Sequence, residues 1–391
     1  MTTSIIISIC LLLILAYIFD ITSSKTKIPS VIFLLIVGWA VKQGTETLEL
    51  PLPNLTSILP GLGTVGLILI VLEGSLELEL NKSKLPFIGK SALVAIIPML
   101  LLSFGLAFAF HYFGSVSIKI ALANAIPLAV ISSAIAIPSA QNLTSINKEF
   151  ITYESSLSDI FGVILFNFIT LNDSIGASSV LDFILELFVI LVITFVATLA
   201  LAFLLSKIKH PVKFIPIILS IVLIYNVTKI YHLPGLIFIL LFGIFLGNLD
   251  QIKNNKFIQK LQPNLLDKEV HKFKELIAEI AFLVRALFFL LFGYLIETPE
   301  LLNTKTIVWA IGICIGIFAL RYASLKVFKL NIKPLLYIAP RGLITILLFL
   351  SIPNHQMTDL ANKSLIIQVI ILSALVMMLG LMAYKPDSEN D

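Results

Sequence analysis

The chain has 391 residues, 58% of them hydrophobic and only 13% charged, with a mean hydropathy of +1.04. Soluble domains carry roughly 25% charged residues, so this composition excludes a soluble globular protein and indicates a polytopic membrane protein. The net charge of +4 reflects lysines in short loops and gives no reason to expect nucleic acid as a partner. Cys10 and Cys314 lie far apart in apolar runs, which favours packing roles over a disulfide or a metal site.

Apolar runs of about twenty residues recur along the whole chain, which predicts membrane-spanning helices and not the shorter alternating strands of a barrel. The first run, 5–19, has no basic residue before it and no small-residue cleavage site, so we expect a retained helix instead of a signal peptide. We therefore predict an all-α polytopic membrane protein with thirteen spans. In chain order these cover residues 4–20, 28–42, 58–79, 87–112, 117–141, 149–171, 180–206, 213–230, 233–249, 273–297, 304–326, 334–353 and 363–384.

The basic residues of the loops fall mainly on one side of this arrangement. Nineteen lysines lie in the alternate loops that begin with Lys25 and end with Lys385, five lie in the other loops, and the three arginines lie within spans. Cytoplasmic loops carry an excess of Lys and Arg, so we expect the N-terminus outside and the C-terminus in the cytoplasm. The expected location is the cell (inner) membrane. The longest connection, 250–272, is polar and basic and predicts either a surface helix or a hinge.

The spans divide into two comparable blocks. We expect one transporter domain over 1–384, with six spans in each of the blocks 1–171 and 213–384, a connector helix at 180–206 and a short cytoplasmic tail at 385–391. Inverted repeats of this kind are common in transporters, and their broken helices carry the binding site near the middle of the membrane.

Helix breakers interrupt spans five and twelve, which occupy corresponding positions in the two blocks. Span five contains Ser133, Ala134 and Ile135 followed by Pro138, and span twelve contains the sequence Pro340-Arg341-Gly342. A proline removes a backbone donor and clashes with the preceding turn, and irregular backbone inside a membrane is tolerated where it lines a protein cavity. The pattern predicts two crossing helices that are broken at the site.

Asp159 in span six is followed by thirteen residues without a charge. An acid in such a position is costly and usually marks an ion or proton path. Ser155 lies one helical turn before Asp159 on the same face, so the two side chains can hold one sodium ion together with unwound carbonyls of span five. Burial favours the protonated form of a carboxyl group, and a group that holds either a proton or a sodium ion is sufficient for exchange.

Glu154 is expected to serve a different purpose. It is five residues from Asp159 and points about 140° away on a helix, so it is not expected to share the ion. An ion pair with Arg341 or Arg321 in the second block is one interpretation, and a position at the cytoplasmic mouth beside Lys148 is the other.

Two further charges lie inside predicted spans. Glu73 in span three is either an acid at the membrane interface or part of the ion path. Arg285 in span ten is either a structural charge partner or a side chain that extends to the cytoplasmic surface.

Four motifs resemble those of a known family, in the family's order. The segment 72–78 reads LEGSLEL and is similar to the glutamate-rich third-helix motif of the cation/proton antiporter superfamily. The segment 154–159, ESSLSD, resembles the Glu-Ser-Leu-Leu-Asn-Asp motif of its NhaP and sodium/proton-exchanger branch. The segment 288–293, FFLLFG, resembles a phenylalanine-rich helix that ends in Gly, and 339–342, APRG, resembles a Gly-Pro-Arg-Gly motif preceded by Arg321. The resemblance covers essentially the whole chain.

The resemblance implies a thirteen-helix inverted-repeat fold, usually in a homodimer, whose core moves in an elevator-like step against a dimerisation domain while sodium is exchanged for protons. Asp159 would be the ion- and proton-binding acid and Ser155 a ligand. Glu154 and Arg341 would form a structural pair, with Arg321 lining the core.

This chain departs from the family pattern at two places. Ser158 stands where the exchanger branch has Asn, which helps to brace the site. The Thr-Asp-Pro motif of span five is missing, because residues 133–138 read SAIAIP without a carboxylate and look more like the Ser-Ser-Thr-Ala pattern of the potassium-efflux branch.

We therefore predict a monovalent cation/proton antiporter for sodium or lithium. We expect electroneutral exchange, because Asp159 is the one acid evident in the core and its neighbour is Ser158. A potassium/proton antiporter is the alternative within transport, and a membrane sensor or ion-conducting effector on the same fold is the alternative of another class. No Gly-rich phosphate loop, metal-ligand cluster or nucleophile–base pair indicates an enzyme, and no cofactor is expected besides the transported ions.

Overall fold

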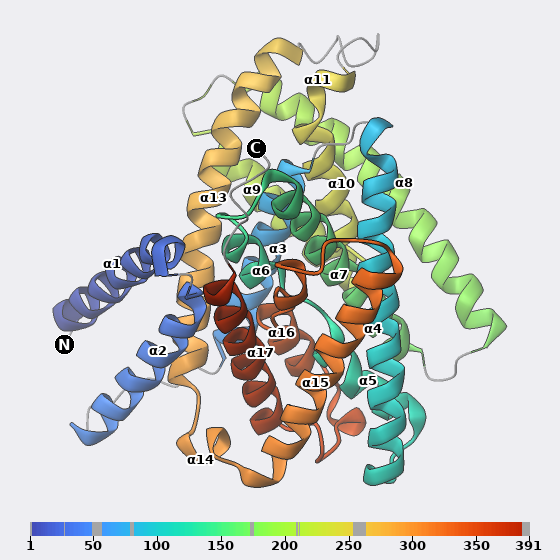
Figure 1. The fold of residues 1–391 in the computed structure, drawn as a ribbon. Helices are drawn as coiled ribbons and strands as arrows, with labels where there is room; N and C mark the ends of the chain where they lie inside the picture. Colours follow the sequence, from blue (N-terminus) through green and yellow to red (C-terminus); the bar gives the residue numbers. More distant parts are fainter. Residues whose placement is uncertain are drawn as a thin grey trace.

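The computed structural model describes residues 2–26, 28–48, 57–78, 82–172, 176–208, 210, 212–252 and 263–384. In these residues the secondary structure is helical throughout, without a β-strand (Figure 1). The predicted all-α class is therefore confirmed. The predicted cytoplasmic tail, 385–391, lies outside the described residues.

The helices follow the predicted order of spans. The uninterrupted ones are α1 (Thr2–Thr26), α2 (Ser30–Thr47), α3 (Leu59–Glu77), α4 (Leu85–Gly114), α7 (Ser145–Leu171), α8 (Ala177–Lys207), α9 (Phe214–Ile230), α10 (Leu236–Gly247), α13 (Pro263–Tyr294), α15 (Thr304–Val327) and α17 (Lys363–Ala383). Two more spans are interrupted, with α5 (Ile118–Ala129) followed by α6 (Ser133–Ser139), and the short η2 (Leu335–Tyr337) followed by α16 (Leu343–Leu350). The connections hold the short elements η1 (Lys82–Lys84), α11 (Leu249–Ile252), α14 (Thr298–Leu301) and η3 (Asn354–Gln356). Among the described residues, eight helices are long and apolar enough to cross a membrane, with α5 and α6 counted as one.

The prediction for span ten is wrong at its start. The predicted bounds were 273–297, whereas α13 begins at Pro263 and ends at Tyr294. Proline is well suited to the first turn of a helix, and polar residues of the early turns have partners outside the helix. Lys213 forms an ion pair with Glu269, and Lys274 lies 3.7 Å from Glu77. From Pro263 on, the predicted loop 250–272 is thus the first part of α13, with Leu266 and Val270 buried, so the choice between a surface helix and a hinge stays open for residues 253–262, which lie outside the described residues.

The helices form two groups that pack mainly within themselves. The core bundle consists of α4, α5, α6, α7, α15, α16 and α17, in which α4 packs on α5, α7 and α15, and α15 packs on α17. The flanking bundle consists of α1, α2, α3, α8, α9, α10 and α13, in which α13 packs on α2 and α3, and α10 packs on α3 and α8. Helix α3 is the member of the flanking bundle that contacts α6, α7 and α16 of the core bundle (Figure 1).

The two interrupted helices of the core bundle meet at their breaks. Val130 and Ser132 have extended backbone after α5, and the stretch from Ile338 to Gly342 between η2 and α16 has no helix. The amide of Ser132 donates a hydrogen bond to the carbonyl of Pro340 over 2.9 Å. A Cβ at Gly342 would lie 2.6 Å from Ile135 Cδ1 and 2.9 Å from Ser132 Oγ, so a larger residue at this position would require these side chains to shift. The predicted broken helices in spans five and twelve are confirmed.

The position of the break in span five differs from the one that Pro138 indicates. Pro138 lies inside α6, and Pro127 lies inside α5, three residues before the break. The break itself contains no proline or glycine. It is stabilised by tertiary hydrogen bonds, because Ile131 N donates to Ser158 Oγ over 3.0 Å and Ser132 N donates to span twelve.

The connection between α13 and α15 is tied to both bundles. Glu297, which follows the end of α13, forms an ion pair with Lys42 of α2. Glu300 lies 2.9 Å from Lys363 at the start of α17, and Trp39 Nε1 donates to Thr298 Oγ1 over 3.2 Å. The short helix α14 thus joins the flanking bundle to the core bundle.

The Lys42–Glu297 pair gives a pH-dependent prediction. The hydrogen bond from Lys42 and its positive charge hold the pKa of Glu297 below its ordinary value. Because the pKa is lower in the folded state, the stabilisation is fully present above the ordinary Glu pKa and is lost as the pH falls through the lowered value. The Glu297 side chain is 56% exposed, so we expect an effect of at most about 1 kcal/mol. The melting temperatures of wild type and Glu297→Gln in detergent should differ at neutral pH and converge in acid, and a difference that grows in acid would contradict this account.

Candidate ion-binding site

Asp159 lies in the middle of α7, inside the core bundle, and its side chain is only 2% exposed. Ser133, the first residue of α6, holds one of its carboxylate oxygens. The Ser133 hydroxyl donates a hydrogen bond to Asp159 Oδ2, and the Ser133 amide donates to the same oxygen over 3.4 Å. The other oxygen, Oδ1, is buried and has no hydrogen-bond partner among the described residues. The break in span five therefore presents its first helical residue directly to the acid of span six.

The serines around Asp159 have different environments. Ser155 Oγ donates to the carbonyl of Ile151 over 2.7 Å, which leaves its lone pairs available. Ser158 Oγ accepts the hydrogen bond from Ile131 and so braces the broken segment. Ser156 Oγ is buried without a partner among the described residues. The sequence pattern predicted Ser155 and Ser158 as site residues but not Ser156, the third serine of the segment 155–158.

The buried pair that involves Glu154 is formed with Arg321 and not with Arg341. Arg321 Nη1 lies 2.6 Å from Glu154 Oε1 and Arg321 Nη2 lies 2.8 Å from Oε2, so the pair is bidentate. The two side chains are 1% and 3% exposed. This excludes the position of Glu154 at the cytoplasmic mouth beside Lys148, and the pair with Arg341 that the family resemblance implied is wrong.

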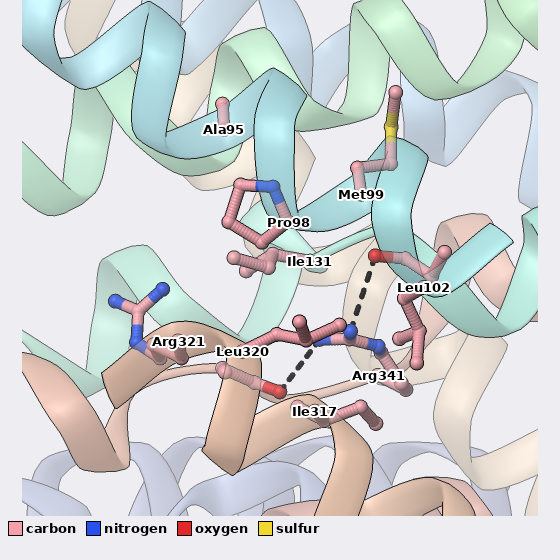
Figure 2. Close-up of a pocket in the computed structure, with 11 residues that line it drawn as sticks. Ala95, Pro98, Met99, Leu102, Ile131, Ile317, Leu320, Arg321 and Arg341 are labelled. Carbon is pink, nitrogen blue, oxygen red and sulfur yellow. Dashed lines mark hydrogen bonds between the residues drawn. The ribbon is translucent and has the colours of Figure 1, made fainter. Parts of the chain in front are cut away.

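Arg341 instead binds backbone carbonyls. Its Nε donates to Leu128 O over 2.8 Å, its Nη2 to Ala129 O over 3.1 Å and its Nη1 to Ala339 O over 2.9 Å. Leu128 and Ala129 are the last residues of α5, whose carbonyls have no partners within the helix. Figure 2 shows two of these hydrogen bonds beside a cavity of about 20 Å³, which has room for about one water molecule. Arg341 thus caps the broken helix, and this explains why Glu154 pairs with Arg321.

Two large cavities lie near the site, one lined by residues of α6 and the other by residues of the second half of α7. One has a volume of about 460 Å³ and is lined by residues that include Ser133, Ile137, Gly74 and Glu73. The other has a volume of about 430 Å³ and reaches Val163, one turn beyond Asp159. The first cavity therefore touches the hydroxyl that binds Asp159, and the second does not.

Glu73 and Arg285 face each other across the wall of the first cavity. Arg285 Nη1 lies 4.0 Å from Glu73 Oε2, and both residues line the cavity. Pro138 lines the same cavity, whereas Ala134 and Ile135 are buried in the packing behind Ser133. The structure thus brings Ser133 to Asp159, and it brings Glu73 and Arg285 to the cavity that leads there. No group of three or more His, Cys, Asp or Glu side chains suited to a metal ion occurs among the described residues.

Comparison with known proteins gives one family and one fold. Residues 10–383 match the family described as sodium/hydrogen exchanger, transmembrane. The structure is similar to that of the sodium proton antiporter MjNhaP1 from Methanocaldococcus jannaschii at pH 8, with a TM-score of 0.73, 18% sequence identity, and coverage of 98% of this chain and 100% of that chain. A map of the same antiporter by electron microscopy gives a TM-score of 0.72 and 19% identity, over 99% of this chain and 100% of that chain.

No curated protein sequence matches the chain. The family match nevertheless spans nearly the whole chain, and the fold agrees with it over the same length. The family consists of membrane transporters and not of enzymes. The chain is therefore a multi-pass membrane protein that belongs to the sodium/hydrogen exchanger family.

Proposed function

We propose that the chain exchanges sodium or lithium ions for protons across the cell membrane, and that Asp159 holds either the cation or the proton. The observation that carries the proposal is the environment of its carboxylate. One oxygen is fixed by Ser133, the other is buried and has no hydrogen-bond partner within the described part of the chain, and a large cavity reaches Ser133. A cation at the free oxygen replaces the proton, because one carboxylate cannot hold both charges.

The charges of the core bundle support electroneutral exchange. Glu154 and Asp159 are the two fully buried acids among the described residues, and Glu154 is paired with Arg321. A proton and a sodium ion each add one positive charge at Asp159. The core bundle therefore carries the same net charge with sodium bound as with a proton bound. One-for-one exchange then moves no net charge across the membrane.

The arrangement of cavities supports alternating access. The excess of lysines in alternate loops assigns the cavity at Ser133 to the cytoplasmic side, with the N-terminus outside. The apolar side chains of Leu67, Val163 and Ile344 line the opposite cavity near the level of the site. An elevator-like shift of the core bundle against α3 would transfer Asp159 from the first cavity to the second.

Several parts of this proposal come from the sequence and from the family resemblance. We infer two inverted blocks, 1–171 and 213–384, around the connector at 180–206, and a homodimer in the membrane. We infer Ser155, Ser158 and Glu73 as further residues of the ion path, with the crossing segment from Ser133 to Pro138 as its frame. The transported ions are the only small partners that we propose.

Purified protein in proteoliposomes tests this function. A sodium or lithium gradient should move protons in the opposite direction. The exchange rate should be the same at different membrane voltages. Currents on solid-supported membranes that scale with voltage would contradict electroneutral exchange. A lack of proton movement with sodium, lithium and potassium would contradict the antiport itself.

Potassium/proton exchange is the second candidate, and the crossing segment favours it. The crossing segment 130–133 carries no carboxylate, and it contacts Asp159 through the neutral hydroxyl and the amide of Ser133. A site with fewer charged ligands holds small, strongly hydrated cations less firmly. Proton movement driven by potassium, but not by sodium at equal concentration, would establish this alternative.

A further inference from the structure

Ser156 is a buried hydroxyl of α7 that the site described above does not use. We propose that Ser156 Oγ is a further ligand of the transported cation and that it contributes to the choice between cations. The proposal rests on the exchange function proposed above, because it assigns a ligand to the same ion.

Ser156 and Asp159 offer two unused oxygens on one helix face. The Ser156 side chain is 1% exposed, and neither Ser156 Oγ nor Asp159 Oδ1 has a hydrogen-bond partner among the described residues. Residues three apart on a helix lie on the same face with adjacent side chains. Buried oxygens without partners are uncommon in folded proteins and require an explanation. A cation shared by the two oxygens provides one.

The position of Ser156 beside the cavity is the second observation. A Cβ built on Gly74 of α3 would lie 3.1 Å from Ser156 Oγ and 3.4 Å from Ile137 Cδ1. Gly74 and Ile137 line the cavity of about 460 Å³, together with Ser133. Ser156 Oγ therefore lies directly behind Gly74, a residue that lines the cavity and has no side chain of its own. This is where an ion that enters from the cavity would meet α7.

The neighbouring hydroxyls do not fill this position. Ser158 Oγ is bound by the amide of Ile131, and Ser133 Oγ donates to the oxygen of Asp159 opposite to the free one. Ser132 Oγ, which is also buried without a partner among the described residues, lies at the crossing beside Gly342. Of the hydroxyls in the described part of the chain, Ser156 is thus one that has no hydrogen-bond partner and lies next to α3. Ser156 is a neutral ligand, so it adds an oxygen for a hard cation but does not bind the exchanged proton. Asp159 remains the group that binds the proton.

The test compares wild type with Ser156→Ala in proteoliposomes and in detergent. The KM for sodium and lithium should rise roughly tenfold or more, because a neutral oxygen next to a charged group is removed, whereas kcat at saturating cation should stay within about twofold. The rise in melting temperature that sodium causes in purified protein should shrink in the same variant. Gly74→Ala should also raise the KM, because its methyl group presses on the Ser156 hydroxyl.

Ser103→Ala is the matched control, since Ser103 is also buried without a hydrogen-bond partner among the described residues but lies in α4, on another helix than Asp159. It should keep the wild-type KM. A wild-type KM and sodium effect in Ser156→Ala, with both lost in Asp159→Asn, would overturn the role of Ser156 and leave the exchange intact. If sodium, lithium and potassium neither drive exchange by the wild type nor raise its melting temperature, both proposals fail.

Discussion

Proteoliposomes with the Asp159→Asn variant are expected to show no cation-driven proton movement above that of empty vesicles. Asparagine has nearly the same shape as aspartate, and its carbonyl oxygen can still accept the hydrogen bond from Ser133. It carries no charge and does not release a proton at physiological pH. Glu154 cannot replace it, because Arg321 occupies both of its oxygens. Loss of the unpaired buried acid of the core bundle therefore removes exchange and leaves the fold in place.

Asp359→Asn is the matched control for this experiment. Asp359 is exposed in the loop before α17, and its backbone carbonyl, which accepts from Asn362, is unchanged by the substitution. This variant should transport at the wild-type rate. If Asp159→Asn, folded and inserted like the wild type, still exchanges cations for protons, then Asp159 is not the shared site, and a sensor or effector role for this chain gains support.

The Glu154–Arg321 pair is expected to have the largest effect on stability. Arg321→Gln should lower the free energy of unfolding by about 3 to 5 kcal/mol, because it leaves the carboxylate of Glu154 buried without a partner. Glu154→Gln should cost a similar amount, because it leaves the guanidinium of Arg321 buried without its carboxylate partner. The double variant should be more stable than the sum of the two losses predicts, since neither charge remains. The measurement is a double-mutant cycle, in which unfolding in detergent is followed for the wild type, the two single variants and the double variant.

Glu149→Gln provides the comparison for a less buried pair. Glu149 lies 2.8 Å from Lys84, and the two side chains are 29% and 32% exposed. Its loss should cost at most about 1 kcal/mol. Additive losses for Glu154 and Arg321, or losses no larger than that of Glu149, would show that their pair does not hold the core bundle together.

The fold could be predicted from the sequence to the extent that it depends on apolar length and on helix breakers. The thirteen spans and the interruptions in spans five and twelve follow from these features. The exact break in span five could not be predicted, because Val130–Ser132 contains no breaker and is held open by Ser158 and Pro340 from other parts of the chain. The early start of α13 was missed because its first turns are polar and depend on partners such as Lys213.

The site was predictable where one residue type is decisive, and ambiguous where several residues of one type compete. Asp159 is conspicuous as an acid in a long uncharged run. The partner of Glu154 was ambiguous, since spans eleven and twelve each supply an arginine and the choice depends on the carbonyls of α5 that bind Arg341. Ser156 was missed because the side of α7 that faces Gly74 depends on how α3 packs against it.

The central claim is that one carboxylate holds either a cation or a proton, and proton release on cation binding tests it most directly. Sodium is added to purified wild-type protein in weakly buffered detergent solution, and the released protons are counted with a pH indicator alongside the bound sodium. We predict close to one proton released for each sodium ion bound, and no release from Asp159→Asn. Sodium binding without proton release by the wild type, or equal release by the variant, would contradict this account.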